Sequence, residues 1–243
     1  MPGLSRLAVT RLVTSAFAWS SSGRTNDDLV TNLVRDRRLK LPAVEAALRR
    51  VDRKTFVLPA ERGAAYDDRP LGIGYSATIS APHMHAAALE FLAPSIAEKG
   101  SVLDVGCGSG YLLAAFAALG PGVRAHGVEY VPQLAKMADE NLRAHDASLL
   151  ESGRVTVTVG DGWAGLPERA PFDAIHVGAA ARSVPKALIT QLAPGGVMII
   201  PVGPAGGAQE LLRVDKAADG SVSARTLFGV RYVPLVGGDK DEV

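Results

Sequence analysis

The chain has 243 residues, 47% of them hydrophobic and 21% charged, and its 26 basic and 25 acidic side chains leave a formal charge of +1. This length supports one sizeable core, and the balanced charge argues against nucleic acid as a partner. One cysteine excludes a disulfide within the chain. Since no apolar run approaches the roughly 20 residues of a membrane span, we expect a globular protein that binds neither nucleic acid nor membrane.

The first 17 residues carry Arg6 and Arg11 and no acidic side chain. This composition is typical of a mitochondrial transit peptide, but also of an N-terminal extension without a targeting role. Ser20 to Gly23 is expected to be a flexible join, so that residues 1–24 form an extension and residues 25–243 a single folded domain. We expect a cytoplasmic protein, with mitochondrial import as the alternative.

Helices and one long loop are expected in residues 25–99. Thr25 or Asn26 can cap a first helix that runs to about Arg38, and Pro42 is typical of the first residue of a second helix. Residues 53–80 lack periodicity and contain several prolines and glycines, which predicts a long ordered loop of the kind that often covers a binding site. A further helix is expected from Pro82 to about residue 99. Together these elements should form a helical cap and a substrate loop.

Strands and helices alternate in residues 100–243. The expected strands are 101–105, 123–128, 155–159, 172–177, 196–202, 210–215 and 223–232, and the expected helices are 111–119, 131–145 and 185–192. This alternation predicts a doubly wound, mostly parallel, seven-stranded sheet with helices on both faces. Asp219-Gly220 is a turn signal, so the last two strands should form an antiparallel hairpin. The fold class is α/β, with an N-terminal helical cap.

A glycine-rich turn follows the first of these strands, with the sequence Asp104-Val105-Gly106-Cys107-Gly108-Ser109-Gly110. Its glycines allow a sharp turn and a close approach of the backbone to a ligand at the carboxyl edge of the sheet. Tyr111 stands where a dinucleotide fingerprint requires a third glycine, which argues against NAD. The pattern instead resembles motif I of S-adenosylmethionine-dependent methyltransferases, which implies their Rossmann-like fold.

Acidic residues follow the next two strands. Glu129 can accept hydrogen bonds from both hydroxyls of a ribose, and Asp161, before Gly162, can accept one from the amino group of an adenine. The alternative is a structural turn with two solvated acids. Because the three features occur in order at successive strand ends, they favour a site for S-adenosyl-L-methionine and its product S-adenosyl-L-homocysteine.

The segment Ala77-Thr78-Ile79-Ser80-Ala81-Pro82-His83-Met84-His85 resembles a segment of the protein-L-isoaspartate (D-aspartate) O-methyltransferase family. The likeness extends over roughly residues 19–236 and continues in segments 103–106, 152–155, 159–162, 173–181, 201–207 and 232–235. It implies a repair enzyme that methylates the free carboxylate of L-isoaspartyl and D-aspartyl residues in damaged peptides and proteins. It also implies that the final strands are rearranged relative to the commonest methyltransferase order. We assume a monomer.

The resemblance also implies residue roles. Ser80 corresponds to the active-site serine of the family, and Asp68 is placed near the substrate-binding loop. The cofactor-binding positions implied by the turn and the resemblance are Ala77, Thr78, Ile79, Ser80, His85, Asp104, Gly106, Gly108, Ser109, Gly110, Glu129, Asp161 and Gly162. Glu129 replaces the aspartate of many relatives, Cys107 replaces a serine or glycine, and Val236 replaces a threonine whose cofactor contact is not carried over. No metal is implied.

A carboxylate acceptor is already ionised at neutral pH, so its methylation needs no general base. Ser80 would then donate a hydrogen bond that orients the acceptor, although a serine just before a helix can also act as a cap. His83 and His85 do not share a helix face, so a metal pair is not expected. His176, inside an apolar strand, is expected to be a core histidine. A methyltransferase for a small molecule or RNA, and a cofactor-binding module without activity, are the competing functions.

Overall fold

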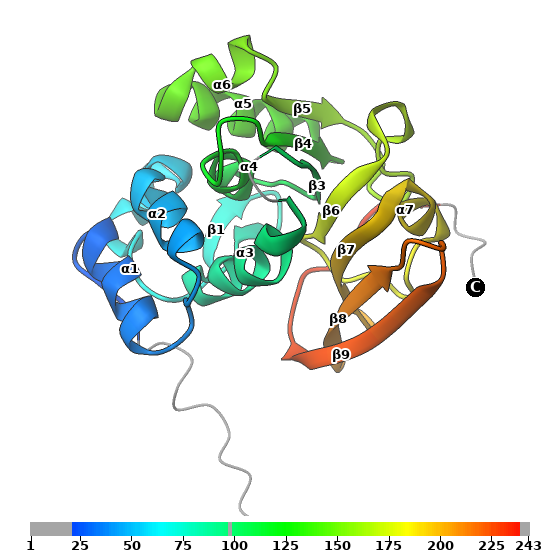
Figure 1. The fold of residues 1–243 in the computed structure, drawn as a ribbon. Helices are drawn as coiled ribbons and strands as arrows, with labels where there is room; N and C mark the ends of the chain where they lie inside the picture. Colours follow the sequence, from blue (N-terminus) through cyan, green and yellow to red (C-terminus); the bar gives the residue numbers. More distant parts are fainter. Residues whose placement is uncertain (1–20, 97–98, 239–243) are drawn as a thin grey trace, which may run out of the picture.

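The structure, a computed structural model, describes residues 21–96 and 99–238 (Figure 1). Its centre is a seven-stranded sheet of order β5-β4-β3-β6-β7-β8-β9. The strands are β3 (Ser101–Val105), β4 (Arg124–Glu129), β5 (Val155–Val159), β6 (Phe172–Val177), β7 (Leu192–Val202), β8 (Gln209–Lys216) and β9 (Val222–Val230). β3 to β7 pair in parallel, whereas β8 and β9 are antiparallel. The predicted sheet and C-terminal hairpin are therefore confirmed.

Helices cover both faces of this sheet. The helices that follow the cap are α3 (Pro82–Ile96), α4 (Tyr111–Ala117), α5 (Pro132–Asp146), α6 (Ser148–Glu151) and α7 (Lys186–Gln191). Leu89, Leu113 and Leu134 of α3, α4 and α5 belong to one hydrophobic cluster, while Leu188 of α7 belongs to a second cluster. Successive strand residues point to opposite faces. Val102 accordingly joins the first cluster and Leu103 the second.

The N-terminal cap packs on the first cluster. It consists of α1 (Asn26–Arg35), α2 (Pro42–Arg50), the short 3-10 helices η1 (Arg53–Phe56) and η2 (Pro59–Ala64), and a hairpin of β1 (Leu71–Gly74) and β2 (Ala77–Ile79). In Figure 1, α1 and α2 (blue) lie at the end of the molecule opposite to the β8–β9 hairpin (orange to red). Thr25 caps α1, because its hydroxyl accepts a hydrogen bond from the backbone N–H of Asp28 at 3.1 Å.

Three predictions about local structure are wrong. The stretch 53–80, expected to be one long ordered loop, contains η1, η2 and the β1–β2 hairpin, whose elements are too short to produce periodicity. The helix α1 ends at Arg35 rather than near residue 38, since Arg37 adopts the left-handed conformation (φ 57°). The last strand ends at Val230, so Arg231 and Tyr232 lie beyond it.

Ser21 to Gly23 are also bonded into the fold rather than forming a flexible join. The buried hydroxyl of Ser21 donates to Asp36 at 2.8 Å, and the backbone N–H of Gly23 donates to the carbonyl of Tyr66 at 3.0 Å. Composition alone does not reveal such long-range bonds. The possible transit sequence in residues 1–17 lies outside the described residues. Among those that are described, no helix is both long enough and apolar enough to cross a membrane.

Candidate active site

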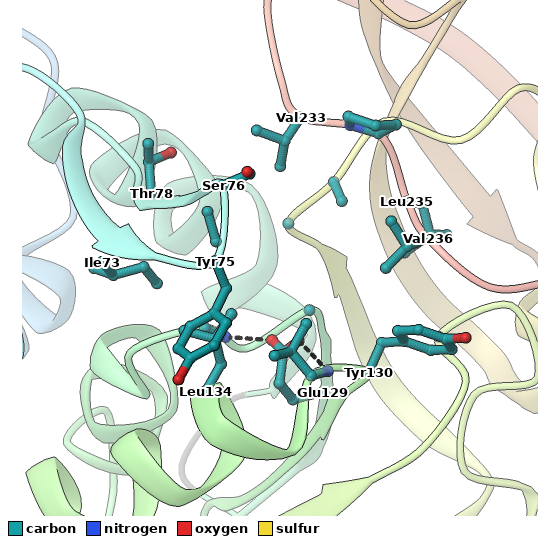
Figure 2. Close-up of a pocket in the computed structure, with 18 of the residues that line it drawn as sticks. Ile73, Tyr75, Ser76, Thr78, Glu129, Tyr130, Leu134, Val233, Leu235 and Val236 are labelled. Atoms are coloured by element: carbon teal, nitrogen blue, oxygen red, sulfur yellow. Dashed lines mark hydrogen bonds between the residues drawn. The ribbon is translucent and has the colours of Figure 1, made fainter.

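A cavity, here called the central cavity, opens at the carboxyl ends of β3, β4 and β6. Figure 2 shows that the β1–β2 turn, with Tyr75 and Ser76, lies on one side, and the C-terminal segment, with Val233 and Leu235, on the other. Gly106 and Gly108 of the glycine-rich turn, Glu129 and Gly162 line it, as do Ala77 and Thr78. The structure therefore brings six of the predicted cofactor residues around one space.

The glycine-rich turn is attached to the end of β4 by backbone hydrogen bonds. Gly106 and Gly108 have φ of 72° and 51°, values that disfavour residues with a side chain. Glu129 accepts a bond from Gly108 N through Oε2 and one from Val131 N through Oε1, both at 3.0 Å (Figure 2). Each carboxylate oxygen retains a further lone pair. Glu129 therefore holds the turn in place and still has acceptor capacity toward the cavity.

Seven of the predicted cofactor residues lie outside the lining of the central cavity, and two of them, Gly110 and Asp161, have structural roles of their own. Gly110 precedes α4 with φ 82°, and a Cβ at this position would approach Ala138 and Leu142 of α5 at 3.3 Å. Its role in the structure is thus helix packing. The carboxylate of Asp161 lines an adjacent cleft and accepts bonds from the backbone N–H groups of Trp163 at 2.9 Å and Gly238 at 2.8 Å. Asp161 accordingly fixes the C-terminal segment beside the cavity.

A second cavity, here called the acceptor groove, lies between the start of α3 and the segment that follows β9. Ser80, His83 and Met84 line one side, and residues 229–233 line the other. Thr78, Gly178 and Val233 line both the groove and the central cavity, so the two spaces meet at these residues. A ligand in the central cavity and a second molecule in the groove would therefore approach each other at Thr78, two residues from Ser80.

A small polar pocket lies behind this junction and brings together five more predicted residues, namely Ile79, Ser80, His85, Asp104 and Ser109. The Ser80 hydroxyl interacts with the phenol of Tyr232, and this interaction lowers the pKa of the phenol, against the larger and opposite effect of burial. Ala81, not Ser80, immediately precedes the first residue of α3, and its carbonyl accepts bonds from Met84 and His85. These contacts favour a role for Ser80 in the groove over the helix-cap interpretation.

His85 is a neutral hydrogen-bond donor in this pocket. Burial lowers its pKa well below the usual value of 6.5, and the charge of Arg53 adds to the effect. Arg53 is itself fully buried and donates from Nη1 to His85 Nδ1 at 3.3 Å, with its pKa lowered by burial to about 10. Because a guanidinium can only donate, Nδ1 must accept, and the proton resides on Nε2.

Two other histidines are oriented by buried carboxylates. His176 donates from Nδ1 to Asp104 at 2.6 Å, so it is a hydrogen-bonded core histidine, as predicted. Asp68 is completely buried, and one of its oxygens accepts bonds from the backbone N–H of His83 at 2.9 Å and from its Nδ1 at 2.8 Å. Asp68 therefore lies behind the groove and orients His83 instead of facing the groove itself.

Some cavity residues were not found from the sequence. Tyr75 and Ser76 line the central cavity in left-handed conformations (φ 52° and 59°), and Tyr130 lines it with half of its surface exposed. Val236 also lines it, although no contact was carried over for this position. Cys107 lines the polar pocket, where burial raises the pKa of its thiol, which argues against a nucleophilic role. The only local signal for Tyr75 and Ser76 is their position next to Gly74.

Three features define a Rossmann-like S-adenosylmethionine-dependent methyltransferase fold. They are the parallel sheet whose last two strands, β8 and β9, run antiparallel, the glycine-rich turn, and the acid at the end of β4. The family model that describes protein-L-isoaspartate(D-aspartate) O-methyltransferase matches residues 24–240. The chain belongs to this family.

Individual relatives agree with this assignment. The chain is 45% identical to a protein-L-isoaspartate O-methyltransferase of Caenorhabditis elegans, over 90% of this chain and 95% of the relative. It is 49% identical to protein-L-isoaspartate O-methyltransferase 1 of Arabidopsis thaliana, over 89% of this chain and 94% of the relative. A Plasmodium falciparum protein described as a protein-L-isoaspartate O-methyltransferase, crystallised with S-adenosyl-L-homocysteine, superposes with a TM-score of 0.80 at 30% identity, over 88% of this chain and 99% of that one.

Proposed function

We propose that this protein transfers a methyl group from S-adenosyl-L-methionine to the free carboxylate of L-isoaspartyl and D-aspartyl residues in damaged peptides and proteins. The observation that carries the proposal is the position of Ser80, which lines the acceptor groove two residues from Thr78, where the groove meets the central cavity. The family to which the chain belongs, and the similarity to proteins with this activity over most of their length, support it.

The residues of the central cavity fit the proposed cofactor. Glu129 retains lone pairs for two vicinal hydroxyls, and Val128, Leu134 and Leu235 provide apolar walls for a purine. The polar pocket adds the Nε2–H donor of His85 and the carboxylate of Asp104, which suit the carboxylate and the ammonium of an amino acid. When bound, S-adenosylmethionine supplies an electrophilic methyl group on a sulfonium.

The residues of the site need only bind, orient and exclude water. Ser80 donates its O–H to the acceptor carboxylate, which is ionised and needs no base. A lone pair of the carboxylate oxygen forms the new O–C bond while the C–S bond breaks and its electrons remain on sulfur, so no proton is transferred. The walls of the two cavities hold the reactants together and restrict access of water, which lowers the barrier through orientation.

The test is a comparison of two peptides that differ only in one isoaspartyl or normal aspartyl linkage, incubated with cofactor carrying a labelled methyl group. We expect label only in the isoaspartyl peptide. Equal labelling of both peptides, or of neither, would refute the proposed substrate. Labelling of RNA or of small molecules in place of the peptide would indicate the competing methyltransferase function.

For the whole protein we propose a monomer with one methyltransferase domain, which acts in the cytoplasm and binds neither nucleic acid nor membrane. A single hydrophobic cluster that joins the N-terminal cap to the sheet supports the one-domain arrangement. Light scattering tests the mass in solution. A fluorescent reporter fused after residues 1–17 tests the location. Fluorescence in mitochondria would contradict the cytoplasmic location and support the transit-peptide interpretation.

A further inference from the structure

The segment after β9 places a second hydroxyl beside Ser80. Tyr232 lines the acceptor groove together with Ser80, and the two hydroxyl groups lie close enough for Ser80 to lower the pKa of the phenol. Tyr232 is half-buried, whereas its neighbours Arg231 and Val233 are exposed, as expected for an extended segment with alternating side chains. The phenol therefore faces the protein, at the wall where an acceptor would lie.

The backbone of Tyr232 is held on both sides by one buried side chain. The N–H of Tyr232 donates to Gln209 Oε1 at 2.6 Å, and Gln209 Nε2 donates to the carbonyl of Tyr232 at 3.2 Å. Gln209 is only 3% exposed. The next residue, Val233, accepts a bond from the N–H of Ala180 at 2.8 Å. The backbone that carries the phenol is thus held in place by these bonds, as precise binding of a ligand requires.

The chemistry of the groove suits an anion at this point. No Asp or Glu is among the residues that line it, and Arg231 and His83 contribute the basic groups. The pKa of the Tyr232 phenol lies above its usual range because of burial, so the phenol keeps its proton at neutral pH. Tyr232 and Ser80 therefore offer two O–H donors on the wall of the groove.

We propose that Tyr232 and Ser80 together hold the acceptor carboxylate through their hydroxyl groups, each donating one hydrogen bond to it. This inference rests on the proposed function, since it concerns the same acceptor. Two donors on fixed backbones define the orientation of the carboxylate in a way that one rotating serine hydroxyl cannot. One oxygen can then be directed toward the central cavity, while neither hydroxyl loses its proton in the transfer.

The decisive variant is Tyr232→Phe, which removes only the hydroxyl. One lost hydrogen bond to a charged group corresponds to roughly a tenfold or greater loss. We expect this loss in kcat/KM for an isoaspartyl peptide and in the affinity for that peptide with S-adenosylhomocysteine present. Cofactor affinity and melting temperature should stay at their wild-type values. Because both hydroxyls bind one carboxylate, the double variant with Ser80→Ala should lose less than the product of the two single losses.

Tyr66→Phe is the matched control, because the Tyr66 hydroxyl bonds to Asp52 at 2.9 Å, away from the groove. It should leave kcat/KM unchanged. Wild-type kcat/KM in Tyr232→Phe would overturn the role of Tyr232 and leave the proposed function in place. A loss of kcat/KM that merely follows reduced stability or reduced cofactor affinity would have the same consequence. A wild-type protein that does not distinguish isoaspartyl from aspartyl peptides would overturn the proposed function and this inference with it.

Discussion

His176 and Asp104 are register partners on the neighbouring parallel strands β6 and β3, and their side chains share a hydrogen bond of 2.6 Å. Both are almost completely buried, with exposed fractions of 8% and 1%. Asp104 lies near the end of β3, just before the glycine-rich turn, and lines the polar pocket with Ser80 and His85. The imidazole thus supports a buried carboxylate that the proposed function assigns to the cofactor.

Replacing His176 by alanine should therefore affect both stability and cofactor binding. The variant leaves the Asp104 carboxylate buried without this donor, which costs roughly 1–3 kcal/mol of unfolding free energy. We expect weaker binding of S-adenosylhomocysteine in calorimetry, partly restored in His176→Asn, whose amide can donate. The control is His126→Ala on β4, whose partner is Thr156 at 2.8 Å and which should change stability alone. Equal cofactor affinity in both variants would contradict the role of His176.

Glu129→Gln should reduce the affinity for the cofactor much more than it slows the chemical step. An amide oxygen can replace only one of the two carboxylate oxygens that accept bonds from Gly108 and Val131. Loss of a charged acceptor corresponds to roughly 1.5–3 kcal/mol, or about tenfold or more in affinity. Calorimetric titration with S-adenosylhomocysteine measures this loss, with the exposed Glu140→Gln on α5 as control. Unchanged affinity for S-adenosylhomocysteine would contradict a role of Glu129 in cofactor binding.

Ser80→Ala should reduce turnover by about five- to tenfold while cofactor affinity stays nearly constant, because one hydrogen bond that orients the acceptor is lost. Melting temperature, cofactor affinity and turnover should be measured on one preparation. A loss of several orders of magnitude would instead indicate a covalent nucleophile. Wild-type turnover with a lower melting temperature would support the helix-cap interpretation.

Acid should destabilise the protein below about pH 6.5. Burial lowers the pKa of His85 well below its usual 6.5, and the pKa values of His126 and His145 are lowered for the same reason. The unfolded chain binds protons at these histidines as the pH falls through 6.5, whereas the folded protein does not, so the unfolding free energy rises with pH in this window. Urea denaturation at several pH values measures the slope, which His126→Gln should reduce. A flat profile would contradict neutral buried imidazoles.

The repeating strand–helix pattern and the glycine-rich turn were predictable from the sequence because their signals are local. β5 (Val155–Val159) and β6 (Phe172–Val177) have the predicted bounds, since each is a short apolar run between turn residues. The turn before α4 and the acid at the end of β4 also depend only on neighbouring residues. The carboxyl ends of parallel strands share one edge of a sheet, so the cofactor cavity could be located without coordinates.

Only the tertiary structure decided how residues from distant segments meet. Ser80, just before α3, and Tyr232, in the C-terminal segment, line one groove, and no periodicity within either segment predicts this proximity. Asp68, which the resemblance placed near the substrate-binding loop, orients His83 from behind the groove, and Gly110, which was assigned to the cofactor from the glycine-rich turn, packs on α5. Local sequence determines which element a residue joins, whereas the packing of whole elements determines which side chains share a cavity.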